Sequence, residues 1–248
     1  MLSGKVAIIT GASSGIGRSA AHAFSAAGAK LVVNARRAEP LDTLVSAIRS
    51  NGGEAIAVPG DAADEDTQNT MVAVAQSEFG GLDIGFNNAG TIGTIKPLAQ
   101  MSLTEWSDVI AVNLTAAFLG ARAQIPAMLE RGGGSIIFTG SFVGNSVSLP
   151  GMTAYGTSKA ALMGLVKGIT ADYAEHNIRA NALLPGGTNT AMAGDAAQRE
   201  WAAGLHAMKR IAEPEEIAKA ALFLASDMAS FVTGSALWAD GGNSAVKI

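Results

Sequence analysis

The 248-residue sequence contains no cysteine, few charged residues and only two tyrosines. Without cysteine, the chain can form no disulfide, no thiolate nucleophile and no cysteine-ligated metal site. Charged residues make up 15% of the chain and the formal net charge is −4. No excess of positive charge therefore favours nucleic acid or an anionic membrane as a partner. The three histidines have no ligand-like spacing, and we expect no catalytic metal.

Long apolar runs are also scarce. The run near the N-terminus, VAII before Thr10, is too short for the apolar region of a signal peptide. The longest mostly apolar stretch, residues 111–129, contains Asn113 and Arg122. We therefore expect no segment long and apolar enough to span a bilayer. These features predict a cytoplasmic protein that does not contact membranes.

Apolar residues are nevertheless abundant, at 48% of the chain, and they form short β-rich runs separated by longer segments of helical periodicity. This alternation predicts an α/β fold, a doubly wound parallel sheet of about seven strands with helices on both faces. The length suits a single domain, residues 1–248. The predicted strands are 6–10, 30–34, 55–58, 82–86, 135–138, 178–184 and 235–239.

Two segments, residues 91–102 and 186–210, do not fit this regular alternation. Both follow predicted strands, so we expect both at the carboxyl edge of the sheet, where open α/β folds bind ligands. The spacing of Ala, Met and Trp in 186–210 is compatible with short helices that form a lid over a substrate. A plain surface excursion is the alternative.

A glycine-rich loop, TGASSGIG, follows the first predicted strand and opens a helix. Glycines at this point allow a tight turn and a close approach of the backbone to a phosphate, which the free N–H groups of the helix can bind. Many strand–helix turns need glycine for geometry alone, but the position after the first strand favours a dinucleotide site. The residues of the predicted site are Gly11, Ser13, Ser14, Gly15, Ile16 and Gly17.

The same loop also satisfies a second pattern. Gly11 to Gly15 read G-x-S-x-G, the nucleophile elbow of α/β-hydrolases, which would make Ser13 the nucleophile. His176 and His206 are available as its partner. An elbow usually follows several strands rather than the first, so we treat the hydrolase as the lesser alternative.

The second predicted strand ends in NARR, residues 34–37. A fold that binds NAD usually has an acidic residue here to bind the ribose 2′-hydroxyl. Arginine instead suits a 2′-phosphate, because its fork of donors can grip the anion. We therefore expect Arg36, with Arg37 beside it, to select NADP, with NAD as the alternative.

Several further stretches occur in a characteristic order along the chain, and with them the sequence resembles a classical short-chain dehydrogenase/reductase over essentially its whole length. The overall pattern is similar to 3-oxoacyl-carrier-protein reductases and to general ketone reductases. The family's NADP-dependent members often carry a basic residue in the glycine loop, where this chain has Ser14. The stretches are TGASSGIG, NNAG (87–90), AVNLTAAF, FTGSFVG, YGTSK (155–159), PGGTNT (185–190) and FVTGSALWADGG (231–242).

The resemblance implies a single-domain Rossmann fold with a catalytic tetrad of Asn113, Ser141, Tyr155 and Lys159. It also implies further contacts with the cofactor. Tyr155 and Lys159 would take part in these, together with Asp61, Ala62, Asn88, Ala89, Gly90, Pro185, Gly186, Thr188 and Thr190. Helices that include residues 106–128 and 155–175 pair between subunits in this family, so the resemblance also implies a homotetramer.

The Tyr155–Lys159 pair has a direct chemical interpretation. The two residues are four apart, so on a helix they share a face and can meet. A phenol ordinarily titrates near pH 10, and a neighbouring ammonium would lower its pKa. Lys159 can also bind the ribose hydroxyls of the nicotinamide, and Ser141 can donate a hydrogen bond to a substrate carbonyl.

These features together predict an NADP(H)-dependent oxidoreductase that interconverts a ketone and a secondary alcohol, with Tyr155 as general acid/base. Phe142, Val143 and the segments 91–102 and 186–210 would shape the pocket for this small-molecule substrate. A non-catalytic dinucleotide-binding sensor or scaffold is the main alternative to an enzyme. It would have no need of Tyr155 and Ser141.

Overall fold

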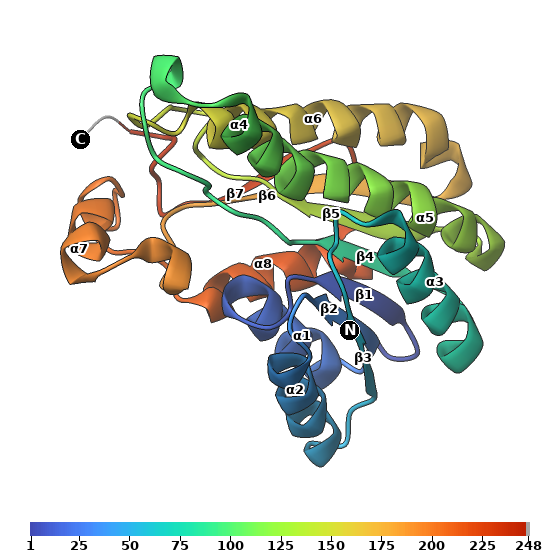
Figure 1. Cartoon of the computed structure of the whole chain (residues 1–248). Coiled ribbons are helices and arrows are strands. Elements are labelled where there is room, and N and C mark those ends of the chain that lie inside the picture. Colours follow the sequence, from blue (N-terminus) through green and yellow to red (C-terminus); the bar gives the residue numbers. More distant parts are fainter. Residues whose placement is uncertain (247–248) are drawn as a thin grey trace.

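The computed structural model describes residues 1–246, which contain one seven-stranded sheet covered by helices on both faces (Figure 1). The spatial order of the strands is β3-β2-β1-β4-β5-β6-β7, and every neighbouring pair is parallel. The predicted fold class is confirmed. The strands are β1 (Val6–Thr10), β2 (Lys30–Ala35), β3 (Ala55–Pro59), β4 (Ile84–Asn87), β5 (Gly134–Thr139), β6 (Ile178–Pro185) and β7 (Ala236–Ala239).

Helices occupy both faces of this sheet. One core, which includes Phe24, Leu41 and Leu224, lies under α1, α2 and α8; the other, which includes Met71, Met128 and Leu162, lies under α3, α5 and α6. The α-helices are α1 (Gly15–Ala26), α2 (Ala38–Ser50), α3 (Glu65–Phe79), α4 (Leu103–Ile110), α5 (Ala116–Arg131), α6 (Thr153–Tyr173), α7 (Ala196–Gly204) and α8 (Pro214–Ala225). Short 3₁₀ turns are η1 (Leu98–Gln100), η3 (Ala174–His176), η4 (Ala191–Ala193) and η5 (Asp227–Ala229).

The apolar strand runs follow from this layering. In β1, Ala7 and Ile9 belong to one core while Val6 and Ile8 belong to the other. Successive side chains of a strand point to opposite faces, so a strand covered on both sides needs an apolar residue at every position. This explains why the strands read as continuous apolar runs and not as alternating patterns.

The strand order places a ligand crevice next to β1. The chain moves outward from β1 to β2 and β3, then crosses back to β4 on the other side of β1. At such a reversal the loops that follow the two strands diverge, and they leave a crevice at the carboxyl edge. The glycine loop follows β1 and NNAG spans the end of β4, so both predicted cofactor segments border this crevice.

Two predicted helix starts are confirmed, and the strand bounds differ slightly from those expected. The Asp64 side chain accepts a hydrogen bond from the backbone N–H of Asp66 and caps α3, and Pro214 is the first residue of α8. Strand β4 begins at Ile84 instead of residue 82, because Leu82 and Asp83 still belong to the loop that enters the sheet. Strand β6 continues to Pro185, one residue beyond the prediction.

Helices α4 and α5 are joined without a break by a π-helical turn, η2 (Ala111–Thr115). The continuous helix Leu103–Arg131 is long and apolar enough, by length and composition, to cross a membrane, and half of its most apolar window is buried inside the fold. The expectation that no segment would reach this length and hydropathy is therefore wrong. Asn113 and Arg122 do not interrupt the helix, and core helices of α/β folds have the same composition.

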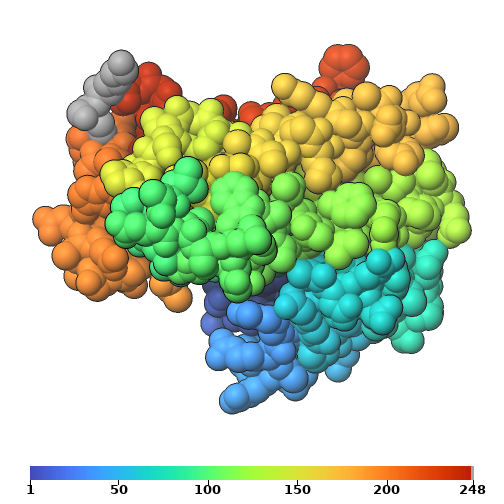
Figure 2. Space-filling model, turned by 45° about the horizontal axis from the view of Figure 1, so that its top comes forward, coloured from blue at the N-terminus to red at the C-terminus, as the bar shows by residue number. Residues whose placement is uncertain are grey.

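The segment 186–210, which we call the lid segment, leaves the carboxyl end of β6 and contains η4 and α7. In Figures 1 and 2 it lies at the same end of the molecule as the segment that follows β4. Residues 91–102 contain only the short turn η1, and their Lys96 N–H donates to the Gly151 carbonyl at 3.2 Å. Both irregular segments therefore lie at the carboxyl edge, as predicted.

Candidate active site

The glycine loop has the geometry of a phosphate cradle. Gly11 and Gly15 have φ of +65° and +52°, in the left-handed region that favours glycine. A Cβ at Gly17 would collide with the carbonyl oxygen of Gly11, so the first turn of α1 packs directly on the loop. The N-terminal N–H groups of α1 have no partner within the helix, and they carry its positive dipole end. The loop therefore fits the pyrophosphate of a dinucleotide.

Asn88 fastens the glycine loop to the centre of the sheet. The backbone N–H groups of Asn88 and Ala89 donate to Thr10 Oγ1 at 3.0 and 3.1 Å, and Asn88 Nδ2 donates to the Thr10 carbonyl at 3.1 Å. Thr139 Oγ1 donates in turn to Asn88 Oδ1 at 3.0 Å. The ends of β1, β4 and β5 are thus joined through one side chain. The sequence analysis predicted Asn88 and Ala89 here but missed both threonines.

Tyr155, Lys159 and Ser141 meet at the carboxyl edge. Tyr155 and Lys159 lie one turn apart on α6, and Lys159 Nζ lies 5.9 Å from the centre of the Tyr155 ring. Tyr155 and Ser141 form a side-chain hydrogen bond. Lys159 is buried, and its Nζ donates to the Thr139 carbonyl at 2.6 Å. The helical spacing thus brings the pair together as predicted.

Gly90 borders the same group of side chains. A Cβ at this position would lie 3.2 Å from Lys159 Nζ and 3.3 Å from Asn113 Oδ1. Any larger residue would therefore crowd both polar groups. This places the end of the NNAG segment directly beside the predicted tetrad.

Asn113 lies in the π-helical turn and is fully hydrogen-bonded within the protein. Its Nδ2 donates to the Thr91 carbonyl and to Ser158 Oγ, each at 2.9 Å, and its Oδ1 accepts from the Thr91 N–H at 2.8 Å. Ser158 Oγ donates to the Tyr155 carbonyl at 2.7 Å. The Asn113 side chain therefore ties the loop after β4 to the first turn of α6. It acts by holding Tyr155 in place.

The pKa of Tyr155 moves in the direction opposite to the prediction. Burial raises the pKa of this phenol above its usual value near 10, and the hydrogen bond with Ser141 only partly opposes the rise. Burial also lowers the pKa of Lys159, from 10.5 to about 8. The sequence analysis assumed that the ammonium would act on the phenol oxygen. In the structure the ammonium is hydrogen-bonded to the Thr139 carbonyl and faces the ring.

Arg36 and Arg37 lie exposed just beyond β2, next to the end of β3. Neither guanidinium forms an ion pair within the part of the chain that the structure describes. Across the gap, the exposed Asp61 accepts a hydrogen bond from the Ala63 N–H at 2.9 Å, and the buried Ala62 carbonyl accepts from Gln68 Nε2 at 2.7 Å. The predicted adenosine-binding residues therefore share one end of the crevice.

The first residues of the lid segment lie across from the glycine loop. A Cβ at Gly15 would come within 2.9 Å of Thr190 Cγ2, and Thr190 Oγ1 caps η4 by accepting from the Met192 N–H at 3.3 Å. Thr188 is buried and donates to the Gly186 carbonyl at 3.1 Å. Pro185 ends β6 immediately before them. The segment 185–190 thus borders the same crevice as the cradle.

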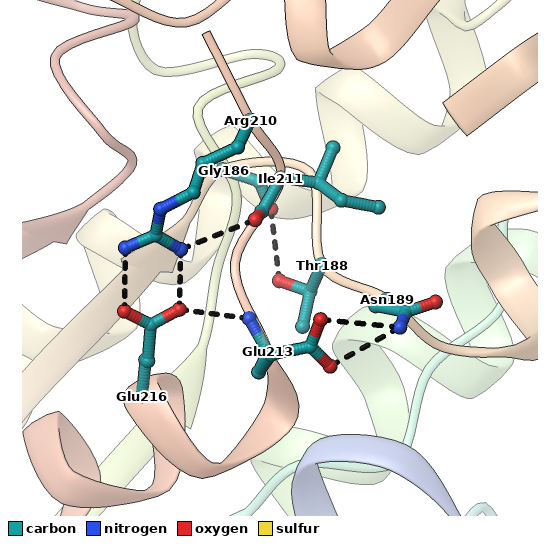
Figure 3. A network of polar contacts seen from close by, with 7 residues as sticks. All are labelled: Gly186, Thr188, Asn189, Arg210, Ile211, Glu213 and Glu216. Carbon is teal, nitrogen blue, oxygen red and sulfur yellow. Dashed lines mark hydrogen bonds and ion pairs between the residues drawn. The ribbon is translucent and has the colours of Figure 1, made fainter. Parts of the chain in front are cut away.

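A polar network holds both ends of the lid segment (Figure 3). Arg210 donates to the two carboxylate oxygens of Glu216 at 2.6 and 2.7 Å, and Asn189 Nδ2 donates to Glu213 at 3.1 Å. The hydrogen bonds from Arg210 lower the pKa of Glu216 to about 2. The sequence analysis missed this network, because the partners are separated in the sequence and no motif marks them.

The structure does not assemble the alternative hydrolase site. Ser13 lies at the carboxyl edge of the sheet, whereas His176 lies just before β6 begins, at the amino edge. His206 is buried, and its two ring nitrogens contact the Ala202 carbonyl and the Gly187 N–H. Neither histidine is hydrogen-bonded to Ser13. Within residues 1–246 there is also no group of three potential metal-ligating His, Asp or Glu residues.

The fold and this arrangement define the class of protein: a dinucleotide-binding α/β protein with a Ser–Tyr–Lys group beside its phosphate cradle. The family model described as enoyl-(acyl carrier protein) reductase matches residues 11–244. A structure described as a short-chain type dehydrogenase/reductase from Mycobacterium marinum superposes with a TM-score of 0.94 at 36% identity, over 99% of this chain and 97% of that one. The chain belongs to the short-chain dehydrogenase/reductase family.

Two other members are similar over nearly their full lengths. The 2,5-dichloro-2,5-cyclohexadiene-1,4-diol dehydrogenase of Sphingobium indicum is 42% identical over 251 residues, which cover 99% of both chains. A gluconate 5-dehydrogenase from Burkholderia cenocepacia, solved in complex with NADP and tartrate, has a TM-score of 0.92 at 34% identity. That match covers 99% of this chain and 97% of that one.

Proposed function

We propose that this protein is an NADP(H)-dependent oxidoreductase that interconverts a ketone and a secondary alcohol, with Tyr155 as the general acid/base. The family and the names of its relatives support an oxidoreductase of alcohols and ketones. The observation that carries the mechanism is the meeting of Tyr155, Ser141 and Lys159 beside Gly90, at the same edge as the glycine cradle.

The residues of the crevice would hold the cofactor along its length. The glycine loop would bind the pyrophosphate, and Arg36 would bind the 2′-phosphate of the adenosine ribose. Lys159 uses one ammonium hydrogen on the Thr139 carbonyl, which leaves two donors for the ribose hydroxyls of the nicotinamide. When bound, the reduced nicotinamide supplies the hydride.

The protein's own groups handle the oxygen of the substrate. Because burial keeps Tyr155 protonated at neutral pH, its phenol can donate a proton to the oxygen of a ketone as that oxygen gains charge. Ser141 supplies a second hydrogen bond to the same oxygen and stabilises its developing charge. Asn113 holds α6 through Ser158, so the phenol stays at the required position.

A cyclic secondary alcohol is the first substrate class to test. The relatives act by name on a chlorinated cyclohexadienediol and on cyclohexanol. Several large apolar side chains of this protein are exposed on the two segments at the carboxyl edge, and they suit a ring better than a charged chain. They are Ile95, Leu98, Met192 and Trp201.

The cofactor assignment gives a prediction on Arg36. We expect Arg36→Ala to weaken NADPH binding by about tenfold or more while leaving NADH binding within about twofold, because only NADPH carries the 2′-phosphate. Energy transfer from tryptophan to the bound reduced nicotinamide measures both affinities. Arg37→Ala, one residue further, is the matched control and should change less. Tighter binding of NADH than NADPH by the unaltered protein would contradict the assignment.

The raised pKa of Tyr155 and the lowered pKa of Lys159 predict the pH dependence of the reaction. At pH ~6 to ~7 the phenol carries its proton and the ammonium its charge, so kcat for ketone reduction should be constant there. As the pH rises through the Lys159 pKa of about 8, the ammonium deprotonates and the rate should decline. A kcat profile with saturating cofactor measures this. A rate that climbs through pH 8 would mean that Lys159 acts in its neutral form.

A further inference from the structure

A buried histidine outside the predicted tetrad joins the lid segment to the end of β6. His206 lies on the turn that follows α7 and is 2% exposed. Its Nδ1 lies 2.7 Å from the carbonyl oxygen of Ala202 in α7, and its Nε2 lies 2.9 Å from the backbone nitrogen of Gly187. Both ring nitrogens are therefore used, one on each side of the lid segment.

These contacts determine which ring nitrogen carries the proton. The Gly187 N–H can only donate, so Nε2 must be the acceptor with a free lone pair. The Ala202 carbonyl can only accept, so Nδ1 must carry the hydrogen. The imidazole is consequently neutral, in the Nδ1–H form. A ring with the hydrogen on Nε2, or on both nitrogens, would set two donors against each other at Gly187.

The contact at Gly187 matters more than the contact at Ala202. The Ala202 carbonyl also accepts the Leu205 N–H at 3.1 Å, so it keeps a partner without the histidine. The Gly187 N–H donates to His206 Nε2, and no second acceptor lies within hydrogen-bonding distance of it in the described chain. Loss of that acceptor would leave a backbone donor unsatisfied next to a buried ring.

The ring also fixes the local shape of the crevice. A Cβ at Gly186 would lie 2.5 Å from His206 Nε2, and the centre of the Phe142 ring lies 6.1 Å from that of His206 in an edge-on arrangement. Phe142 directly follows Ser141. On its other side, the Gly187 carbonyl accepts the Ala212 N–H at 2.8 Å. His206 thus touches the end of β6, α7 and the segment that carries Ser141.

We propose that His206 is a positioning residue: in its neutral Nδ1–H form it holds Gly187, and with it Thr188, so that the lid segment stays docked at the carboxyl edge. Its effect on turnover rests on the proposed function. Its effect on the lid segment does not, because the contacts belong to the protein alone.

Two substitutions separate the two contacts. In His206→Gln the amide reaches the position of Nε2, so Oε1 can accept from the Gly187 N–H. In His206→Asn the amide stays at the position of Nδ1, so the Ala202 contact survives and Gly187 loses its acceptor. We expect H206N to lower kcat/KM for ketone reduction about tenfold, mainly through KM, and H206Q to stay within about threefold of the unaltered protein.

Limited proteolysis gives a second readout that needs no turnover. Trypsin should cleave after Arg199, in α7, several times faster in H206N than in H206Q or the unaltered protein. If this contrast appears while none of the three proteins reduces any ketone, the proposed function fails and the role of His206 stands. Equal losses in both variants would overturn the proposal, because they would show that only the shape of the ring matters. Unchanged cleavage and kinetics in both would overturn it as well.

The unaltered protein provides a test that does not depend on how the variants fold. Nitrogen-15 NMR of the labelled full chain distinguishes a protonated from an unprotonated ring nitrogen. We expect the His206 signals to show hydrogen on Nδ1 and a free Nε2 at neutral pH. Hydrogen on Nε2 would be incompatible with the Gly187 contact and would overturn the assignment.

Discussion

Replacing Tyr155 by phenylalanine is expected to lower kcat for ketone reduction by about a thousandfold, within the range that general acids contribute. The substitution removes the phenol oxygen and leaves the ring, which lies 5.9 Å from Lys159 Nζ, in place. The glycine cradle and the arginines are untouched, so NADPH binding should change by less than about threefold. Single-turnover reduction with saturating NADPH would measure the loss directly.

The sequence itself offers a matched control for this experiment. The only other tyrosine is Tyr173, the last residue of the same helix and almost five turns further along it. Tyr173→Phe should leave kcat unchanged. If Y155F keeps full activity, the phenol is not the proton donor, and another group must supply the proton. A protein that binds NADPH but shows no turnover in any form would point instead to the sensor or scaffold.

Lys159→Met is expected to abolish ketone reduction to a similar extent and to change how stability depends on pH. The pKa of Lys159 is about 8 in the folded protein against an ordinary 10.5, so the charged form is destabilised by burial. Below pH 8 the wild type carries this full cost, about 3 kcal/mol. From pH ~8 to ~10.5 the unfolded chain holds more protons than the folded one, so wild-type stability rises with pH. The variant should lack that rise.

Urea unfolding of both proteins at several pH values measures this difference. Lys167→Met is the matched control, because Lys167 lies two turns further along α6 and is exposed. It should keep its activity and follow the wild-type pH dependence of stability. A constant gap between K159M and wild type from pH 7 to pH 10 would show that Lys159 titrates as an ordinary lysine.

The sequence predicted the fold because local signals and the global architecture agree. Strands buried on both faces need continuous apolar runs, and such runs, separated by helical periodicity, occur seven times in the chain. The glycine loop could be located because its close contacts admit no side chain. The helical spacing of Tyr155 and Lys159 likewise determines their proximity once α6 exists.

The parts that escaped prediction depend on contacts between residues distant in the sequence. Thr10 and Thr139 end two apolar strands and look like ordinary strand residues until Asn88 is placed between them. His206 looks unremarkable until the chain returns to Gly187. The direction of the Tyr155 pKa was wrong for a related reason. Proximity on a helix was evident, but the burial of both groups and the Thr139 carbonyl that takes the ammonium were not.

The π-helical turn at Ala111–Thr115 constrains how this protein can change over evolution. A π turn accommodates one residue more than an α turn, so deleting a single residue there would rotate all of α5 by about 100° about its axis. Ala117 and Ala121, now buried against the sheet, would turn away from it, and Asn113 would lose its alignment with Ser158. Substitutions that keep size and polarity can accumulate along this helix one at a time. A change in its length requires compensation at both ends at once, so the residue count between Ser102 and Gly132 should vary less among relatives than the residues themselves.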